Sequence, residues 1–388
     1  MLSSDKVPWL ELALTPGLGA ARARRLLERF GSPQAIFGAS RRDLARVEGM
    51  DNALLDSITG RRGRNGLDNQ LLLLDRYKAD FIPLEDARYP DSLRSIYGPP
   101  VGLFVKGEIK RDDYFSLAVV GTRMSSFYGR QMSAKISGQL AEKGMVIVSG
   151  GARGIDTAAH WACLRAGGRT IAVLGCGLDT VYPAENKELF ARIAERGALV
   201  SEFALGTSPD RKYFPMRNRI ISGLSLGVLV VEAPLRSGAL ITVRHAVDQG
   251  REVFSVPGEA GKFNSLGTNQ LLREGARLVE GADDIWQELE RYVRQRVKEM
   301  RSACPQRNEG VRKSPSAGAV KAAAENDGDL GAGERSIYAL LSDDPRHIDF
   351  ISDKSGLPLG KVSSALLCLE MKGLIKQLPG KMFRLNAG

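Results

Sequence analysis

Between residues 115 and 286 the chain alternates short apolar runs with segments of helical character, and this alternation constrains the fold more than any other feature. The apolar runs are rich in Val, Ile, Leu and Ala, as expected of strands buried on both faces, and lie at 116–120, 146–149, 170–174, 198–201, 227–232 and 252–256. The helical segments between them lie at 131–143, 157–166, 186–196, 220–224 and 241–249. We therefore predict an α/β fold with a doubly wound, mostly parallel sheet.

The first 68 residues have a different pattern, in which short helical segments are separated by glycine turns such as 16–19 and 47–50. Within residues 20–30 the apolar side chains recur at helical spacing, and three arginines share another face: Arg22, Arg25 and Arg29. The pattern resembles a tandem helix-hairpin-helix (SAM-like) domain, whose glycine amides can approach a DNA phosphate. A small packing domain with a solvated basic face would explain the same residues.

After residue 290 the composition changes twice. Residues 291–333 begin with an excess of Lys and Arg and continue as an Ala/Gly/Ser-rich stretch, which predicts a flexible linker. Residues 334–388 contain three helical segments and then two β-rich runs separated by a Pro-Gly turn, the order of a winged helix. The position of the recognition helix, 359–372, carries only two basic residues, so contact with a protein or a structural role explains it as well as duplex DNA does. Residues 69–290 remain as the domain that contains the sheet.

Composition narrows the possible functions. The net charge is +10 and the pI is near 9.5, which favours a polyanionic partner such as nucleic acid, although solubility alone would explain a basic surface. The longest apolar runs fall far short of the ~20 residues that cross a bilayer, and no secretion signal is evident, so we expect a cytoplasmic protein without membrane contact. Four cysteines and three histidines predict no disulfide framework, metal site or cofactor.

Three glycine-bearing turns directly follow predicted strands, at 121–123, 149–156 and 175–177. Such turns lie at the carboxyl edge of a parallel sheet, where backbone amides and helix N-termini can hold phosphate groups. None matches a GxGxxG or Walker A pattern, so neither a dinucleotide dehydrogenase nor a P-loop enzyme is indicated. Turn geometry alone is the alternative explanation for any one of them.

The sharpest chemical signal is the sequence RKYFPMRNRII at 211–221. Its cations could hold phosphates, and an exposed Phe214 could stack on an unpaired base, which is worth roughly 1–3 kcal/mol per base. The alternative is that the aromatic rings are buried and that Arg217 or Arg219 is tied to structural carboxylates. The role of Glu232, at the end of a predicted strand, is left open between a ribose, a base edge and an arginine.

These motifs together resemble those of the DNA-processing protein A (DprA/Smf) family. The resembling stretches cover residues 115–285 in family order and include VGTR at 120–123, SGGARGID at 149–156, YPAEN at 182–186, FPMRNRII at 214–221, PG at 257–258 and GTN at 267–269. The resemblance implies an extended Rossmann-like domain that binds single-stranded DNA, dimerises, and protects incoming DNA. It also implies loading of RecA recombinase during natural transformation, in competent cells, with no catalytic turnover.

The predicted DNA-binding residues combine two sources. The resemblance supplies most of them, and Lys212 and Phe214 are added on physical grounds. The complete set is Gly121, Thr122, Arg123, Ser149, Gly150, Gly151, Arg153, Gly154, Lys212, Phe214, Arg217, Asn218, Arg219 and Lys262.

Two other functional classes stay open. The same loops could hold one nucleotide in a Rossmann-like enzyme or sensor that acts on a nucleotide derivative. Nucleotide phosphoribohydrolases, which share related folds, carry a PGGxGTxxE motif that residues 257–269 do not match. A protein that organises duplex DNA would bind duplex and single strands equally.

Overall fold

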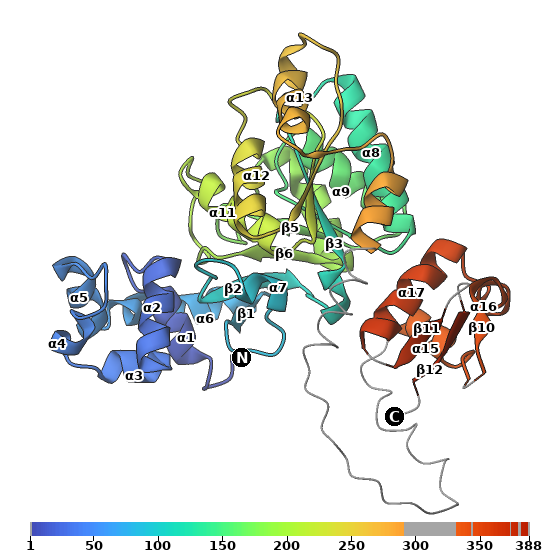
Figure 1. Cartoon of the computed structure of the whole chain (residues 1–388). Coiled ribbons are helices and arrows are strands. Elements are labelled where there is room, and N and C mark those ends of the chain that lie inside the picture. The colour runs from blue at the N-terminus through green and yellow to red at the C-terminus, as the bar shows by residue number, and fades with distance from the viewer. Residues whose placement is uncertain (1, 291–330, 343, 373, 379–381, 387–388) are drawn as a thin grey trace, which may run out of the picture. The chain divides into compact units, whose positions relative to one another are not determined.

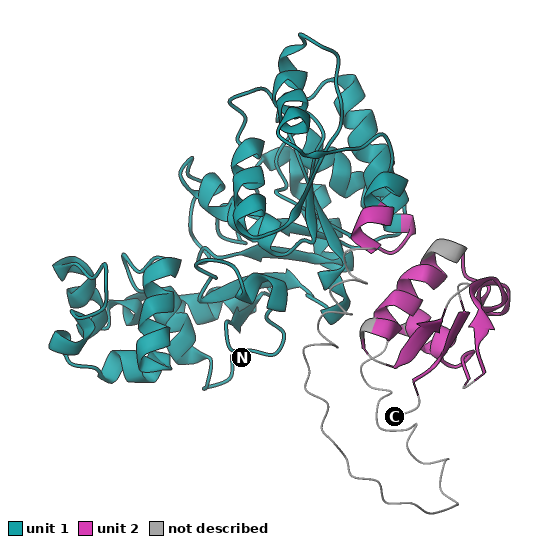
Figure 2. Cartoon of the chain, viewed as in Figure 1, with its two compact units in different colours: residues 1–141, 145–285 teal, residues 142–144, 286–388 magenta. Residues whose placement is uncertain are grey.

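The structure is a computed structural model that describes residues 2–290, 331–342, 344–372, 374–378 and 382–386. It divides into two compact units, residues 1–141 with 145–285, and residues 142–144 with 286–388 (Figure 2). Most of the predicted linker at 291–333, and the Pro-Gly turn of the predicted wing, lie outside the described residues.

Within the described residues, the first unit contains a sheet of nine strands in the order β1-β2-β6-β5-β4-β3-β7-β8-β9 (Figure 1). The strands are β1 (Asp80–Pro83), β2 (Gly102–Gly107), β3 (Ser116–Val120), β4 (Val146–Ser149), β5 (Thr170–Val173), β6 (Ala198–Ser201), β7 (Gly227–Val230), β8 (Glu252–Ser255) and β9 (Arg277–Leu278). All neighbours from β6 to β9 pair in parallel, whereas β2 pairs antiparallel with both β1 and β6. The chain runs from β3 to β6 in one direction and then places β7 on the other side of β3, so β3 and β7 flank the topological switch point.

Helices cover both faces of this sheet (Figure 1). They are α7 (Asp91–Arg94), α8 (Phe127–Glu142), α9 (Ile155–Arg165), α10 (Lys187–Arg196), α11 (Tyr213–Gly223), α12 (Ala239–Asp248) and α13 (Leu266–Arg273). Because successive side chains of a strand point to opposite faces, each strand contributes to two cores. Ala172 of β5 belongs to one core with Ile193 of α10, whereas its neighbours Ile171 and Val173 belong to another with Ile220 of α11.

Six short helices precede the sheet: α1 (Val7–Ala13), α2 (Ala20–Phe30), α3 (Pro33–Gly38), α4 (Arg41–Leu44), α5 (Asn52–Thr59) and α6 (Leu67–Arg76). Their apolar side chains share one continuous core with α10, from Leu10 and Leu26 to Ile193. The buried Gln70 side chain of α6 also donates to the carbonyl of Leu205 at 2.8 Å and accepts from its amide at 3.1 Å. The N-terminal helices therefore pack as part of the first unit.

The second unit contains a small three-helix domain with a three-stranded sheet in the order β10-β12-β11. Its elements are α15 (Ala332–Tyr338), β10 (Arg346–His347), α16 (Ile348–Ser355), α17 (Leu359–Met371), β11 (Ile375–Leu378) and β12 (Met382–Leu385). Ile337, Ile351, Leu366 and Phe383 lie in its core. The element order is that of a winged helix, as predicted.

The structure confirms the predicted fold class, and the six predicted strands of the sheet appear as β3 to β8 with ends shifted by at most two residues. One difference affects the site. The sequence pattern predicts a helix only from residue 220, whereas α11 begins at Tyr213. Pro215 does not prevent this, because it lies in the first turn, where a missing N–H costs nothing.

Candidate nucleic-acid interface

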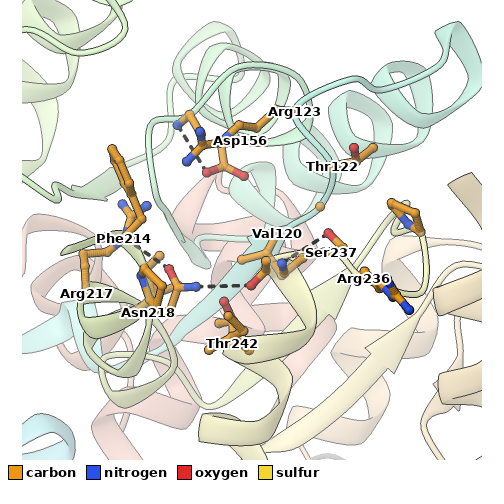
Figure 3. Close-up of a pocket in the computed structure, with 18 of the residues that line it drawn as sticks. Val120, Thr122, Arg123, Asp156, Phe214, Arg217, Asn218, Arg236, Ser237 and Thr242 are labelled. Carbon is orange, nitrogen blue, oxygen red and sulfur yellow. Dashed lines mark hydrogen bonds between the residues drawn. The ribbon is translucent and has the colours of Figure 1, made fainter. Parts of the chain in front are cut away.

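A cleft of about 590 Å³ lies at the switch point between β3 and β7. Its lining comes from four segments: the turn after β3, the turn from β4 into α9, the start of α11 with Arg211 just before it, and the turn from β7 into α12 (Figure 3). Ligands of open α/β sheets bind at this position, because the carboxyl ends of the strands diverge there and leave a crevice.

Arg217 of α11 forms part of the floor of the cleft and is only 4% exposed. Its guanidinium Nη1 donates to the carbonyl of Gly150 at 2.7 Å and to the carbonyl of Val173. These carbonyls lie at the carboxyl ends of β4 and β5, so Arg217 fastens α11 to the sheet. Burial lowers the pKa of Arg217 to about 10, which still leaves it protonated at neutral pH.

Asp156, in the first turn of α9, accepts hydrogen bonds from the glycine turn that follows β4. Its Oδ2 accepts from the backbone N–H groups of Gly150 and Ala152, each at 3.2 Å. Burial raises the pKa of Asp156 to about 6, against the opposing effects of Arg217 and of these amides. The sequence analysis expected the amides of this turn to bind a phosphate. Two of them, those of Gly150 and Ala152, instead donate to a carboxylate of the same chain.

The rim of the cleft carries three exposed arginines: Arg123, Arg211 and Arg236. Within the described part of the chain, none of them has a carboxylate within ion-pair distance. The Arg123 guanidinium carbon lies 4.8 Å from the ring centroid of Phe214 (Figure 3). Phe214 is half-buried, and its ring centroid lies 5.6 Å from that of Tyr182. A base could reach Phe214 only by displacing or sharing the place of Arg123.

The helical conformation of α11 separates residues that are adjacent in the sequence. Arg217 and Asn218 line the cleft, and the Asn218 amide donates to the carbonyl of Gly238 at 3.3 Å. Arg219 lies outside the cleft lining and forms a largely buried ion pair with Glu202. A helix turns by about 100° per residue, so three consecutive side chains cannot share one groove. The structural alternative for Arg219, a tie to a carboxylate, is therefore the one observed.

Three other predicted cations are paired on the surface. Arg153 forms an ion pair with Glu185, and Lys212 lies 3.4 Å from Asp210. Lys262 lies 2.5 Å from Glu259 and lines a different groove, after β8. These residues remain predictions as DNA contacts, and each would have to exchange an intramolecular partner for a phosphate.

Only part of the predicted glycine-turn set lines the cleft. Gly121 and Thr122 line the cleft, whereas the buried Ser149 donates its hydroxyl to the carbonyl of Val119 at 2.6 Å. Gly154 has φ +80°, and a Cβ there would lie 2.5 Å from the carbonyl oxygen of Thr122. Glycine is therefore required at this position by both conformation and space. Gly151 also has a positive φ, of 64°, and packs against Phe190.

Glu232, whose role the sequence left open, caps a helix. Its carboxylate accepts from the backbone amide of Ser126 at 2.8 Å and from the Ser126 hydroxyl, just before α8 begins. Gly129 leaves room for this carboxylate, since a Cβ there would collide with it. The helix dipole favours a negative charge at this end, so Glu232 stabilises the start of α8.

Sequence reasoning missed Arg236 as a member of the site, and it included Arg211 only as part of the cationic stretch 211–221, not in the final set of DNA-binding residues. Arg236 lies in the turn after β7, next to Ser237 and Gly238, and the signal was available as a glycine-bearing turn at the carboxyl edge. Among the described residues there is no cluster of three or more His, Cys, Asp or Glu side chains that could hold a metal ion. No helix in the same part of the chain is long and apolar enough to span a membrane.

Fold and cleft together define a Rossmann-like protein with a basic ligand cleft and two small accessory domains of types that occur in DNA-binding proteins. Comparison with family models agrees with each part. The DNA recombination-mediator protein A model matches residues 80–290, the SAM-like helix-hairpin-helix tandem matches 10–59, and the DprA winged helix domain matches 321–381.

Individual relatives match over most of the chain. The protein Smf of Synechocystis sp. is 34% identical over 399 residues, which cover 99% of this chain and 100% of the relative. The protein Smf of Escherichia coli is 39% identical over 324 residues, which cover 83% of this chain and 82% of the relative. The crystal structure of DNA processing protein A from Streptococcus pneumoniae superposes with a TM-score of 0.64 at 37% identity, and covers 74% of this chain and 98% of that one.

The chain belongs to the DNA recombination-mediator protein A family, also known as DprA/Smf. The predicted family and the predicted general function, DNA recombination mediation, are thereby confirmed.

Proposed function

We propose that this protein binds single-stranded DNA in the cleft between β3 and β7 and transfers it to RecA recombinase without chemical turnover. The observation that carries the proposal is the rim of the cleft. Arg123, Arg211 and Arg236 are exposed and, within the described residues, not neutralised by carboxylates. Exposed arginines that no carboxylate neutralises are free to bind phosphates, and such contacts hold a strand irrespective of its sequence.

The acidic groups in and beside the cleft support a binding role rather than an enzymatic one. The Asp156 carboxylate is held by loop amides, and the Glu232 carboxylate caps α8. Each therefore has a structural task in the folded chain. Membership of a recombination-mediator family supports RecA as the recipient of the strand, together with action as a homodimer in the cytoplasm during natural transformation.

Fluorescence anisotropy of labelled oligonucleotides across a salt series tests the proposal. The parent protein is expected to prefer single strands to duplex, with affinity that falls steeply with salt. An Arg123→Ala/Arg236→Ala variant should bind more weakly, and its salt slope should fall by about 1.4, since each phosphate contact to a single strand contributes about 0.7.

The matched control is Arg165→Ala/Arg192→Ala, which removes the same charge from exposed positions on α9 and α10. If both double variants lost the same affinity for single-stranded DNA, net charge alone would explain the loss. The assignment of the cleft as the DNA site would then be overturned. Equal affinity of the parent for duplex would favour a DNA-organising protein. Release of free base from nucleoside monophosphates would revive the nucleotide-derivative enzyme.

A further inference from the structure

A second groove, of about 780 Å³, lies beside the cleft at the carboxyl edge of the sheet. It is lined by Ser126, Phe127 and Tyr128 at the start of α8, by Glu232, and by the turn after β8 at residues 257–259 and 262–265. We call this set the aromatic groove. Apart from Lys262, none of its residues belongs to the predicted DNA site.

Three aromatic side chains of the groove are largely exposed to solvent instead of being packed in the core. Phe127 is 69% exposed, Phe263 is 71% exposed and Tyr128 is 47% exposed. The Tyr128 hydroxyl donates to the carbonyl of Pro257 at 3.3 Å, which orients its ring. In the described part of the chain none of the three rings stacks on another ring. Clustered exposed apolar side chains of this kind mark an interaction site.

The aromatic groove carries one lysine against two glutamates, unlike the arginine-rich cleft. Lys262 is paired with Glu259 at 2.5 Å, and the buried Glu232 carboxylate is bound to Ser126. No excess of positive charge is left to attract a phosphate. Neutral aromatic surfaces suit unstacked nucleobases, because every base has a face that can stack on a ring.

The aromatic groove and the cleft share a wall. Met124 lines the cleft, and its carbonyl accepts from the Asn264 amide of the groove at 2.9 Å. On the other side of the same asparagine, its backbone carbonyl accepts from Ala233 at 2.8 Å. A strand that leaves the cleft on the β8 side therefore passes directly onto the aromatic groove.

We propose that the aromatic groove is a base-stacking subsite for the same single strand whose phosphates lie along the cleft arginines. This assignment rests on the proposed function, and it adds a division of labour: cations in the cleft hold phosphates, and Phe127, Tyr128 and Phe263 hold bases. The subsite extends the contact beyond the switch point to β8.

A Phe127→Ala/Phe263→Ala variant of the full chain tests the assignment, with Leu72→Ala/Tyr97→Ala as the control. Leu72 and Tyr97 are similarly exposed, at 70% and 73%, on other parts of the first unit. Because loss of one stacked base weakens binding about fivefold or more, the groove variant should lose at least that factor for a 20-mer. Its salt slope should stay unchanged, because no phosphate contact is removed.

A second readout uses 2-aminopurine placed at successive positions of the oligonucleotide. Stacking on the aromatic groove should quench a run of adjacent positions in the parent, and the groove variant should restore their fluorescence. Unchanged affinity and unchanged quenching in a variant that retains the parent's melting curve would overturn the subsite. If the Arg123→Ala/Arg236→Ala variant still lost binding, the proposed function would stand. A changed sedimentation coefficient with unchanged DNA binding would assign the groove to a protein interface and also overturn the proposal.

Discussion

Two regions of the first unit are rich in arginine. In one of them the arginines are bonded to other residues of the chain, and in the other the exposed arginines are not bonded to any described residue. On α2, Arg22 forms an ion pair with Asp51 at 2.9 Å, Arg25 donates to the carbonyl of Glu48 at 3.1 Å, and Arg29 donates to that of Arg46 at 3.5 Å. All three thus hold the turn at residues 46–51. At the cleft, Arg123 and Arg236 project from turns at the sheet edge without such partners among the described residues.

The difference shows that arginine density does not by itself identify a DNA interface. A guanidinium that already donates to a carboxylate or to carbonyls must give up those bonds before it can bind a phosphate, so its net gain is small. A guanidinium with no internal partner has no such cost. The helix-hairpin-helix pattern of the N-terminal region therefore does not make its α2 face equivalent to the cleft.

The largest expected effect concerns Arg217, which lines the cleft but, like the α2 arginines, has hydrogen-bond partners within the chain. Arg217→Ala leaves the Gly150 and Val173 carbonyls buried without their donor and should lower the free energy of unfolding by about 3 kcal/mol. Urea denaturation measures this loss. A variant with the parent's midpoint but lost DNA binding would place Arg217 with the exposed arginines instead.

The next effect depends on pH and concerns His160 of α9, which is buried and contacts Thr170 of β5. Burial lowers the pKa of His160 to about 3, well below its ordinary value of 6.5. The unfolded chain therefore binds more protons between these values, and stability falls as the pH drops through 6.5. Asp156 acts oppositely, because its raised pKa of about 6 lets the folded state take up a proton first as the pH falls below that value.

A His160→Asn variant separates the two contributions while keeping a side-chain donor near Thr170, to which His160 Nδ1 lies at 2.7 Å. Between pH 7 and pH 5 the parent should lose about 2 kcal/mol relative to this variant, at about 1.4 kcal/mol per pH unit below 6.5. Denaturant midpoints at both pH values provide the measurement. Parallel pH profiles for the two proteins would mean that His160 titrates normally.

The smallest effect is expected on α2. Arg22→Ala/Arg25→Ala should cost less than about 1 kcal/mol for each exposed pair removed, because solvent screens these interactions. The salt slope of single-strand binding should stay at the parent's value, in contrast to that of the cleft variant. A slope reduced as much as in Arg123→Ala/Arg236→Ala would show that the N-terminal helices also contact DNA, and would remove the distinction between the two regions.

The sheet could be predicted because its central strands are short apolar runs, buried on both faces, that no other structure explains well. The edge strand β1 and its neighbour β2 were missed, because they lie among prolines and pair antiparallel, without the strand–helix alternation. The site was predicted only in outline. Turn positions such as Arg123 follow from strand ends, but the separation of Arg217 from Arg219 requires knowing that α11 begins at Tyr213.

The sequence did not allow us to predict which groups the charged and polar side chains of the site bind. Whether a loop amide faces solvent or a carboxylate depends on tertiary packing, as the capture of the Gly150 and Ala152 amides by Asp156 shows. The same holds for Glu232, whose helix-capping role joins segments 106 residues apart.

The paired bonds between Gln70 and Leu205 span 135 residues of chain. During synthesis the N-terminal helices leave the ribosome long before their partner, so the Gln70 carboxamide stays hydrated until β6 and the segment after it have been made. Contacts this distant in sequence are formed late and slow the final step of folding. A shortened chain that starts at β1 would leave both the amide and the carbonyl of Leu205 without this partner, six residues before Arg211. The order of synthesis and the order of assembly therefore differ in this protein. The N-terminal helices are made first, but their packing is complete only when the segment that contains Leu205 has been made.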